Sequence, residues 1–125
     1  MRADTGRAGE EAAVRFLEKN GYRILERNAR SALGEIDIVA SEKDVICFVE
    51  VRARKGAVHR VEALESVGRT KQDKLSRLAV SYLKKKRWLD RSARFDVAAV
   101  TFDNGITEVT LLKDAFPVCE RYRMT

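Results

Sequence analysis

The chain has 125 residues, of which 45% are hydrophobic and one is proline, a size and composition that predict one folded domain over residues 1–125 rather than a disordered chain. It has no run of 18 apolar residues and no apolar stretch at its start, so we expect a soluble, cytoplasmic protein without a membrane partner. Two cysteines and one histidine argue against a zinc site or a disulfide framework.

The first half of the chain predicts one helix and three strands. Residues 4–20 have helical periodicity, with Asp4 or Thr5 as the expected cap and Asn20-Gly21 as the stop signal. Residues 22–30 are expected to form a strand. Residues 34–41 and 45–54 are expected to form a hairpin joined at 42–44, in a register that pairs residue 41 with residue 46. The run 45–51 is almost entirely apolar, as in a strand that is covered on both faces.

The second half predicts one helix and one hairpin. Residues 53–68 lack clear periodicity, and we interpret them as a loop with one helical turn at 61–64. Residues 70–88 predict a helix, with Thr70 and Asp73 as a variant capping box. Residues 95–102 and 106–112 predict two strands around the turn signal at 103–105. The order α-β-β-β-α-β-β predicts an α/β (α+β) fold with a central mixed sheet flanked by helices.

Acidic residues are concentrated in the first hairpin. Side chains alternate along a strand, so Glu35 and Asp37 share one face of their strand, and Glu50 and Arg52 share one face of theirs. The expected register places Asp37 opposite Glu50 and Glu35 opposite Arg52. Like charges opposite each other destabilise a sheet. We therefore predict that Asp37 and Glu50 bind a hard divalent cation, Mg²⁺ or Mn²⁺.

Three further residues extend this predicted site. Glu10 lies on the apolar stripe of the first helix and is expected to point inward; alternatively, it is a first-turn glutamate favoured by the helix dipole. Lys71 shares a stripe with the apolar residues of the second helix; alternatively, it is a surface lysine whose stem covers the core. Arg52 is placed to stabilise developing charge, but its guanidinium stays protonated and cannot accept a proton.

The net charge of +6 favours a polyanionic partner, because clustered cations bind phosphates without regard to sequence. Basic residues are concentrated between residues 52 and 87. Among them we expect nucleic-acid contacts, DNA in the first instance, from Arg54, Lys71 and Lys74. The alternative is a solvated helix face that carries lysines for solubility.

Several segments together resemble one bacterial family. They are Gly9-Glu10-x-x-Ala13, Gly21-Tyr22-x-Ile24-x-x-x-Asn28, Gly34-Glu35-Ile36-Asp37-Ile38-Val39-Ala40, Phe48-Val49-Glu50-Val51-Arg52-x-Arg54, Lys71 with Leu75 and Ala79, and Arg94-Phe95-Asp96-Val97. They resemble the YraN-like family over about residues 6 to 102. The resemblance implies a restriction-endonuclease-like fold of the PD-(D/E)xK nuclease superfamily, similar to archaeal Holliday-junction resolvases.

By that resemblance Asp37 is the first metal acid, Glu50 the second and Glu10 the helix-borne acid. The resemblance also implies a lysine at the position that Arg52 occupies. The departure predicts slow or absent cleavage, with metal and DNA binding retained.

Three functions stay open at this point. The first is a Mg²⁺-dependent endonuclease that acts on structured DNA. The second is a nucleic-acid-binding module that keeps the nuclease fold without catalysis. The third is a protein-interaction domain with a basic surface, in which the acids have no function. Whether the chain is an enzyme, and whether it forms a homodimer, stay open as well.

Overall fold

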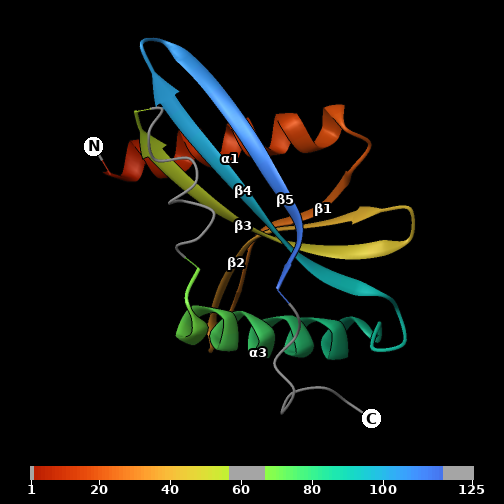
Figure 1. Cartoon of the computed structure of the whole chain (residues 1–125). Helices are drawn as coiled ribbons and strands as arrows, with labels where there is room; N and C mark the ends of the chain where they lie inside the picture. The colour runs from red at the N-terminus through yellow and green to blue at the C-terminus, as the bar shows by residue number, and fades with distance from the viewer. Residues whose placement is uncertain (1, 57–66, 117–125) are drawn as a thin grey trace.

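The computed structural model describes residues 2–56 and 67–116 (Figure 1). The elements are α1 (Arg2–Lys19), β1 (Arg23–Ser31), β2 (Gly34–Glu42), β3 (Val45–Lys55), α3 (Arg69–Lys86), β4 (Ala93–Asp103) and β5 (Ile106–Phe116). This is the predicted order α-β-β-β-α-β-β. The helical turn expected at 61–64 lies outside the described residues. None of the described helices is long and apolar enough to cross a membrane.

The five strands form one mixed sheet in the order β1-β2-β3-β4-β5. Strands β3 and β4 run parallel, and the other neighbouring pairs are antiparallel. Parallel neighbours cannot be joined by a tight hairpin, and α3 lies in the connection between β3 and β4. Helices α1 and α3 cover opposite faces of the sheet (Figure 1). The predicted fold class, a mixed sheet flanked by helices, is confirmed.

Strand β3 is the centre of the core, as its apolar run predicts. Cys47 and Val49 pack with Leu17 of α1, whereas Ile46 and Phe48 pack with α3 on the other face. Residues 46–50 are all buried. Because successive side chains of a strand point to opposite faces, only a continuously apolar strand can pack against both helices.

The helix starts differ from the expected ones. Helix α1 begins at Arg2, so Asp4 and Thr5 lie within it and the predicted cap is wrong. Helix α3 begins at Arg69, after Gly68, and has no side-chain cap. The predicted capping box is therefore wrong, because Thr70 already lies inside the helix.

Both hairpin turns are tighter and more regular than expected. The first has Lys43 and Asp44 at φ 47° and 70°, and the second has Asn104 and Gly105 at φ 50° and 77°. Two consecutive residues with positive φ are typical of the two-residue turns that match the twist of a hairpin. Strand β5 runs beyond residue 112, the expected end, because Phe116 is buried.

Candidate metal centre

The sheet forks beside the acidic residues. The pairing of Ser41 with Ile46 confirms the predicted hairpin register, but the β2–β3 ladder ends at the pair Ile38–Val49. Beyond that pair, β2 stays with β1 as far as Gly34, and β3 continues beside β4. Asp37 is the first residue past the last β2–β3 pair, so its side chain lies in the fork.

Asp37 takes over one backbone contact that the ladder has lost. Its Oδ2 accepts a hydrogen bond from the N–H of Val51 at 2.8 Å. Asp37 and Glu50 are therefore close without being ladder partners, near enough for the charge of Glu50 to add to burial in raising the pKa of Asp37. The expected position of Glu35 opposite Arg52 is wrong, because the ladder has ended before it; Glu35 instead pairs with Arg30 of β1, Oε2 to Nε, at 2.8 Å.

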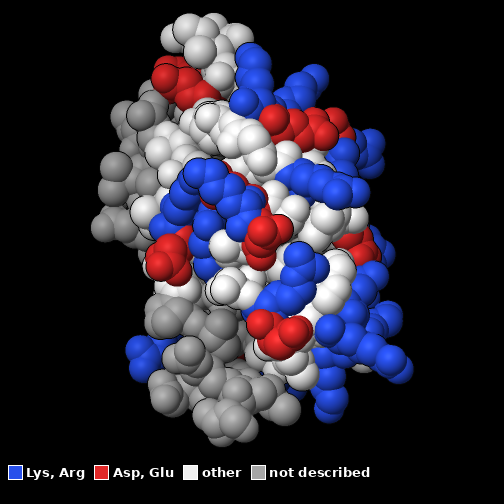
Figure 2. Space-filling model, turned by 90° about the vertical axis from the view of Figure 1, so that its right-hand side faces the viewer, with Lys and Arg blue, Asp and Glu red and all other residues white. Residues whose placement is uncertain are grey.

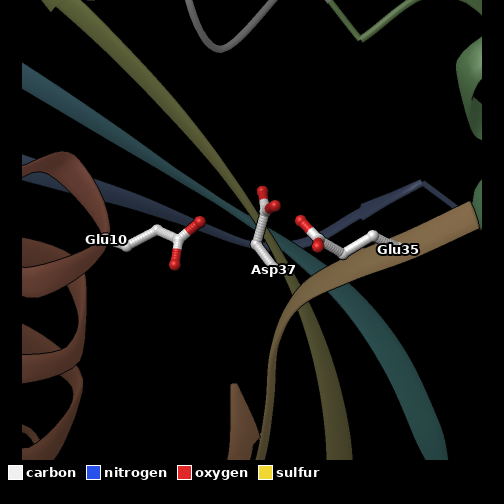
Figure 3. Close-up of side chains that lie close together, drawn as sticks. All are labelled: Glu10, Glu35 and Asp37. Carbon is white, nitrogen blue, oxygen red and sulfur yellow. The ribbon is translucent and has the colours of Figure 1, made fainter. Parts of the chain in front are cut away.

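Three carboxylates converge at the fork. One oxygen each from Glu10, Glu35 and Asp37 lie within 4.8 Å of one another. In Figure 3, Glu10 reaches Asp37 from α1 and Glu35 reaches it from the other side. We call these three residues the acid cluster. Sequence reasoning did not assign Glu35 to the metal site, although its spacing of two from Asp37 was the available signal.

Glu50 lies beside the acid cluster in a more positive setting. Its side chain is 7% exposed, and its Oε2 lies 3.4 Å from both the Arg52 Nη1 and the Lys71 Nζ. The structure thus brings together Glu50, Arg52 and Lys71, which come from β3 and α3. Lys74, one helical turn further on, lies against Gly34 at the start of β2: a Cβ built on Gly34 would be 3.0 Å from the Lys74 Cε.

Burial and the crowding of carboxylates at the fork raise the pKa of Asp37 and of Glu10. Burial, and next the charge of Glu50, raise the pKa of Asp37 to about 7, although the hydrogen bond from Val51 opposes the shift. Burial also raises the pKa of Glu10, against a hydrogen bond with Asn28; the charge of Glu35 adds to the increase. In both groups, burial and the neighbouring carboxylates together outweigh the contacts that favour ionisation.

The acid cluster fits a divalent cation. Mg²⁺ binds oxygen at about 2.1 Å in octahedral geometry, which places neighbouring ligand atoms about 3.0 Å apart and opposite ones about 4.2 Å apart. Three carboxylate oxygens within 4.8 Å meet these spacings after small side-chain movements. Bound water and substrate phosphates typically fill the other positions around Mg²⁺.

Asn28 is a second residue that sequence reasoning did not assign. It has φ 51° in the middle of β1, a conformation that asparagine adopts more readily than most residues. The flanking pairs Arg27–Ile38 and Ala29–Ile36 set it opposite Asp37, and its side chain hydrogen-bonds to Glu10. The only sequence signal is the resemblance of the segment that contains it.

A pocket of about 420 Å³ opens next to the acid cluster. Its lining consists of Gly6, Glu10, Asp37, Val51, Ala53, Arg54 and Lys55. Acidic and basic side chains therefore face the same space. Within residues 2–56 and 67–116, neither Arg54 nor Lys55 has a carboxylate partner. A larger groove of about 1250 Å³ lies between α1 and the β4–β5 hairpin, but it contains no residue of the acid cluster.

The close approach of α1 to β3 depends on Gly9. A Cβ built at this position would lie 2.7 Å from the Cβ of Ala53, which is too near for either backbone to stay in place. Gly9 therefore lets the helix approach β3 one residue before Glu10. The pair Gly9-Glu10 is also part of the resemblance found in the sequence.

The family model and the relatives that match this chain all point to one protein family. A family model described as "Uncharacterised protein family UPF0102" matches residues 9–100. A UPF0102 protein of Syntrophus aciditrophicus is 45% identical over 112 residues, which cover 90% of this chain and 87% of the relative. One from Pelotomaculum thermopropionicum is 53% identical over 98 residues, covering 78% and 81%. The matched region contains Glu10, Glu35, Asp37 and Glu50.

Proposed function

The chain belongs to the uncharacterised protein family UPF0102, and from this premise we propose that it is a Mg²⁺- or Mn²⁺-dependent endonuclease acting on structured DNA. The observation that supports this most is the pocket in which Glu10 and Asp37 face Arg54 and Lys55. Acids that suit a metal ion and cations that suit phosphates then share one space. The YraN-like resemblance supports the same reaction class.

Glu10, Glu35 and Asp37 would hold the cation. When bound, it would polarise a phosphodiester and make a coordinated water more acidic. Arg54 and Lys55 would attract the neighbouring phosphates of the strand into the pocket. None of these contacts distinguishes one base from another, so the chain would recognise the structure of the DNA rather than its sequence.

Lys71 changes the significance of Arg52. Arg52 cannot exchange a proton, but Lys71 brings an ammonium group to the same distance from Glu50, 3.4 Å. A lysine ammonium is a compact donor with three rotatable N–H groups. Lys71 would therefore supply the protonatable cation that position 52 lacks, and both groups would stabilise negative charge that develops nearby.

A second candidate function is a nucleic-acid-binding module without catalysis. The observation that favours it is Arg52. This residue lies two positions after Glu50 on the same strand, and its guanidinium cannot exchange a proton. Lys71 reaches Glu50 from a different element, the helix α3. This candidate keeps the metal and the DNA contacts and predicts no cleavage of any DNA structure.

The test of the metal centre is calorimetry with Mn²⁺ and with Mg²⁺. Wild type is expected to bind, and Asp37→Asn is expected to bind at least tenfold more weakly, because it removes the central charge of the acid cluster. Glu11→Gln is the matched control: Glu11 is the neighbour of Glu10 on α1 but pairs with Arg27 at 2.7 Å. Equal heats for wild type and Asp37→Asn would contradict the proposed site. Cleavage of four-way, flap and linear DNA then separates the two candidates.

Arg52→Lys is expected to raise the cleavage rate by one to two orders of magnitude, about 1.4 to 2.7 kcal/mol of barrier. The reason is that lysine at this position adds a second proton-exchanging cation beside Glu50. The measurement is single-turnover cleavage of a four-way junction with Mg²⁺, with Glu50→Ala as the blank. A wild type that cleaves rapidly and a slower lysine variant would show that arginine is the better residue here.

A further inference from the structure

A stripe of polar and basic residues runs along α3 away from the candidate metal centre. Lys71, Lys74, Ser81 and Lys85 follow one another at spacings that keep them on one side of a helix. The stripe begins at the acid site, since the Lys71 Nζ is 3.4 Å from Glu50. Basic side chains gather at the lower right of the face in Figure 2, the end of the molecule where α3 ends.

The far end of the stripe forms one wall of a small groove. This groove, of about 90 Å³, lies between α3 and the β1–β2 hairpin, and its lining includes Arg30, Ser31, Ser81, Lys85 and Lys86. At the volume of liquid water this is room for about three water molecules, so the groove suits a compact group. Three cations and two hydroxyl groups are the donors that a phosphate needs.

The one carboxylate in the groove lining already accepts a hydrogen bond from within the protein. This carboxylate, Glu26, accepts it from the Tyr82 hydroxyl at 3.0 Å. Burial and this contact with Glu26 raise the pKa of Tyr82 to about 12, so the phenol stays a donor at neutral pH. Arg30 also pairs with Glu35, whereas neither Lys85 nor Lys86 pairs with any carboxylate of the described residues.

We propose that this groove is a phosphate subsite for a double-stranded DNA arm that runs along α3 from the candidate metal centre. The position of the reacting phosphate rests on the proposed function. Fourteen residues separate Lys71 from Lys85, and at 1.5 Å per helical residue this is about 21 Å. At 3.4 Å per base pair the distance is about six base pairs.

A duplex fits the groove better than a single strand does. Single strands are typically held by aromatic rings on which bases stack. The one ring in this lining, Tyr82, already packs edge-on against Phe48 at 5.8 Å and has the Lys86 ammonium 5.5 Å from its centre. A duplex arm keeps its phosphates at a fixed distance from the branch point, which a flexible strand does not.

The experiment compares two double variants on junctions whose hairpin-closed arms have about four or about twelve base pairs. Lys85→Ala/Lys86→Ala removes two cations of the groove. Arg77→Ala/Lys84→Ala removes two exposed cations of α3 that lie outside the groove lining. Affinity is measured against salt concentration in EDTA, so that metal binding and cleavage do not affect the result.

On long arms the groove variant is expected to flatten the log–log salt slope by up to about 1.8, the value for two lost phosphate contacts. On short arms it should match wild type, and Lys85→Arg/Lys86→Arg should restore the slope on long arms. The control pair should have the same small effect on both arm lengths.

Equal slopes for the two double variants, or a groove effect independent of arm length, would overturn the subsite. An acidic peptide that competes as well as DNA would overturn it too. The subsite and the nuclease proposal fail separately. If Asp37→Asn binds metal as wild type does while the arm-length effect persists, the metal centre is wrong and the subsite stands.

Discussion

Asp37→Asn is expected to make the metal-free protein more stable at pH 8 and to leave its stability almost unchanged near pH 4. Burial and the charge of Glu50 raise the pKa of Asp37 from 3.8 to about 7. Because the pKa of Asp37 is higher in the folded state than in the unfolded state, ionisation of this carboxyl group favours unfolding. The wild type therefore loses stability as the pH rises from about 4 to about 7. At about 1.4 kcal/mol per unit, the loss is on the order of 3 to 4 kcal/mol.

The measurement is urea unfolding of both proteins between pH 4 and pH 8 in EDTA. Glu18→Gln, on the exposed side of α1, is the control and should follow wild type at every pH. A wild type whose stability does not fall between pH 4 and pH 7 would show that Asp37 is already ionised without metal.

Metal should close most of the stability gap between the two proteins. A ligand that binds only the folded state adds about 2.7 kcal/mol at a hundred times its Kd. Saturating Mn²⁺ at pH 8 is therefore expected to stabilise wild type and to have little effect on Asp37→Asn. The same substitution would then stabilise the free protein and abolish the gain from metal, which is the behaviour expected of a binding site whose charge destabilises the fold.

Asp96→Ala is expected to destabilise the protein by about 3 to 5 kcal/mol, the cost of removing one partner from a buried charge network. Asp96 is 0% exposed. Its carboxylate accepts hydrogen bonds from the Arg94 Nε at 2.9 Å, the Tyr22 hydroxyl at 3.1 Å and the N–H of Asp114 at 2.9 Å. The substitution would leave a largely buried guanidinium and a backbone donor without this acceptor.

Urea unfolding at pH 7 measures this cost. Asp96→Asn keeps the shape of the side chain and should lose less than Asp96→Ala. Lys113→Ala is the surface control, since Lys113 is 52% exposed and pairs with Glu42 at the rim of the network; it should cost less than about 1 kcal/mol. An Asp96→Ala variant within 1 kcal/mol of wild type would mean that the network contributes little to stability.

The order of the elements could be predicted because each of its signals is local. The apolar run of β3, the helical spacing of α3 and the Asn104-Gly105 turn each depend on neighbours within a few residues. The same is true of the hairpin register, which places Asp37 next to Glu50 through the turn and the two strands alone. The helix starts are harder to predict from the sequence. The spacing of Thr70 and Asp73 matches a capping box, but the same two residues can also lie inside a helix, as they do in α3.

The composition of the candidate site depended on contacts distant in sequence. After Val49, β3 continues beside β4 while β2 stays with β1. The first hairpin encodes neither of these pairings. That fork frees Asp37 from the ladder and turns Glu35 toward Glu10 rather than toward Arg52. Lys71 reaches Glu50 only because α3 crosses the sheet between two parallel strands.

Local chemistry by itself therefore determined the elements, the hairpin and the pair of acids that a cation would have to neutralise. The tertiary structure alone decided that Glu35 completes the acid cluster and that Asn28 contacts Glu10. It also decided that Arg54 and Lys55 face the cluster across a pocket. The reason is physical: periodicity and turn chemistry act over a few residues, whereas the meeting of α1, β1, β2 and β3 at one fork depends on how the whole sheet pairs.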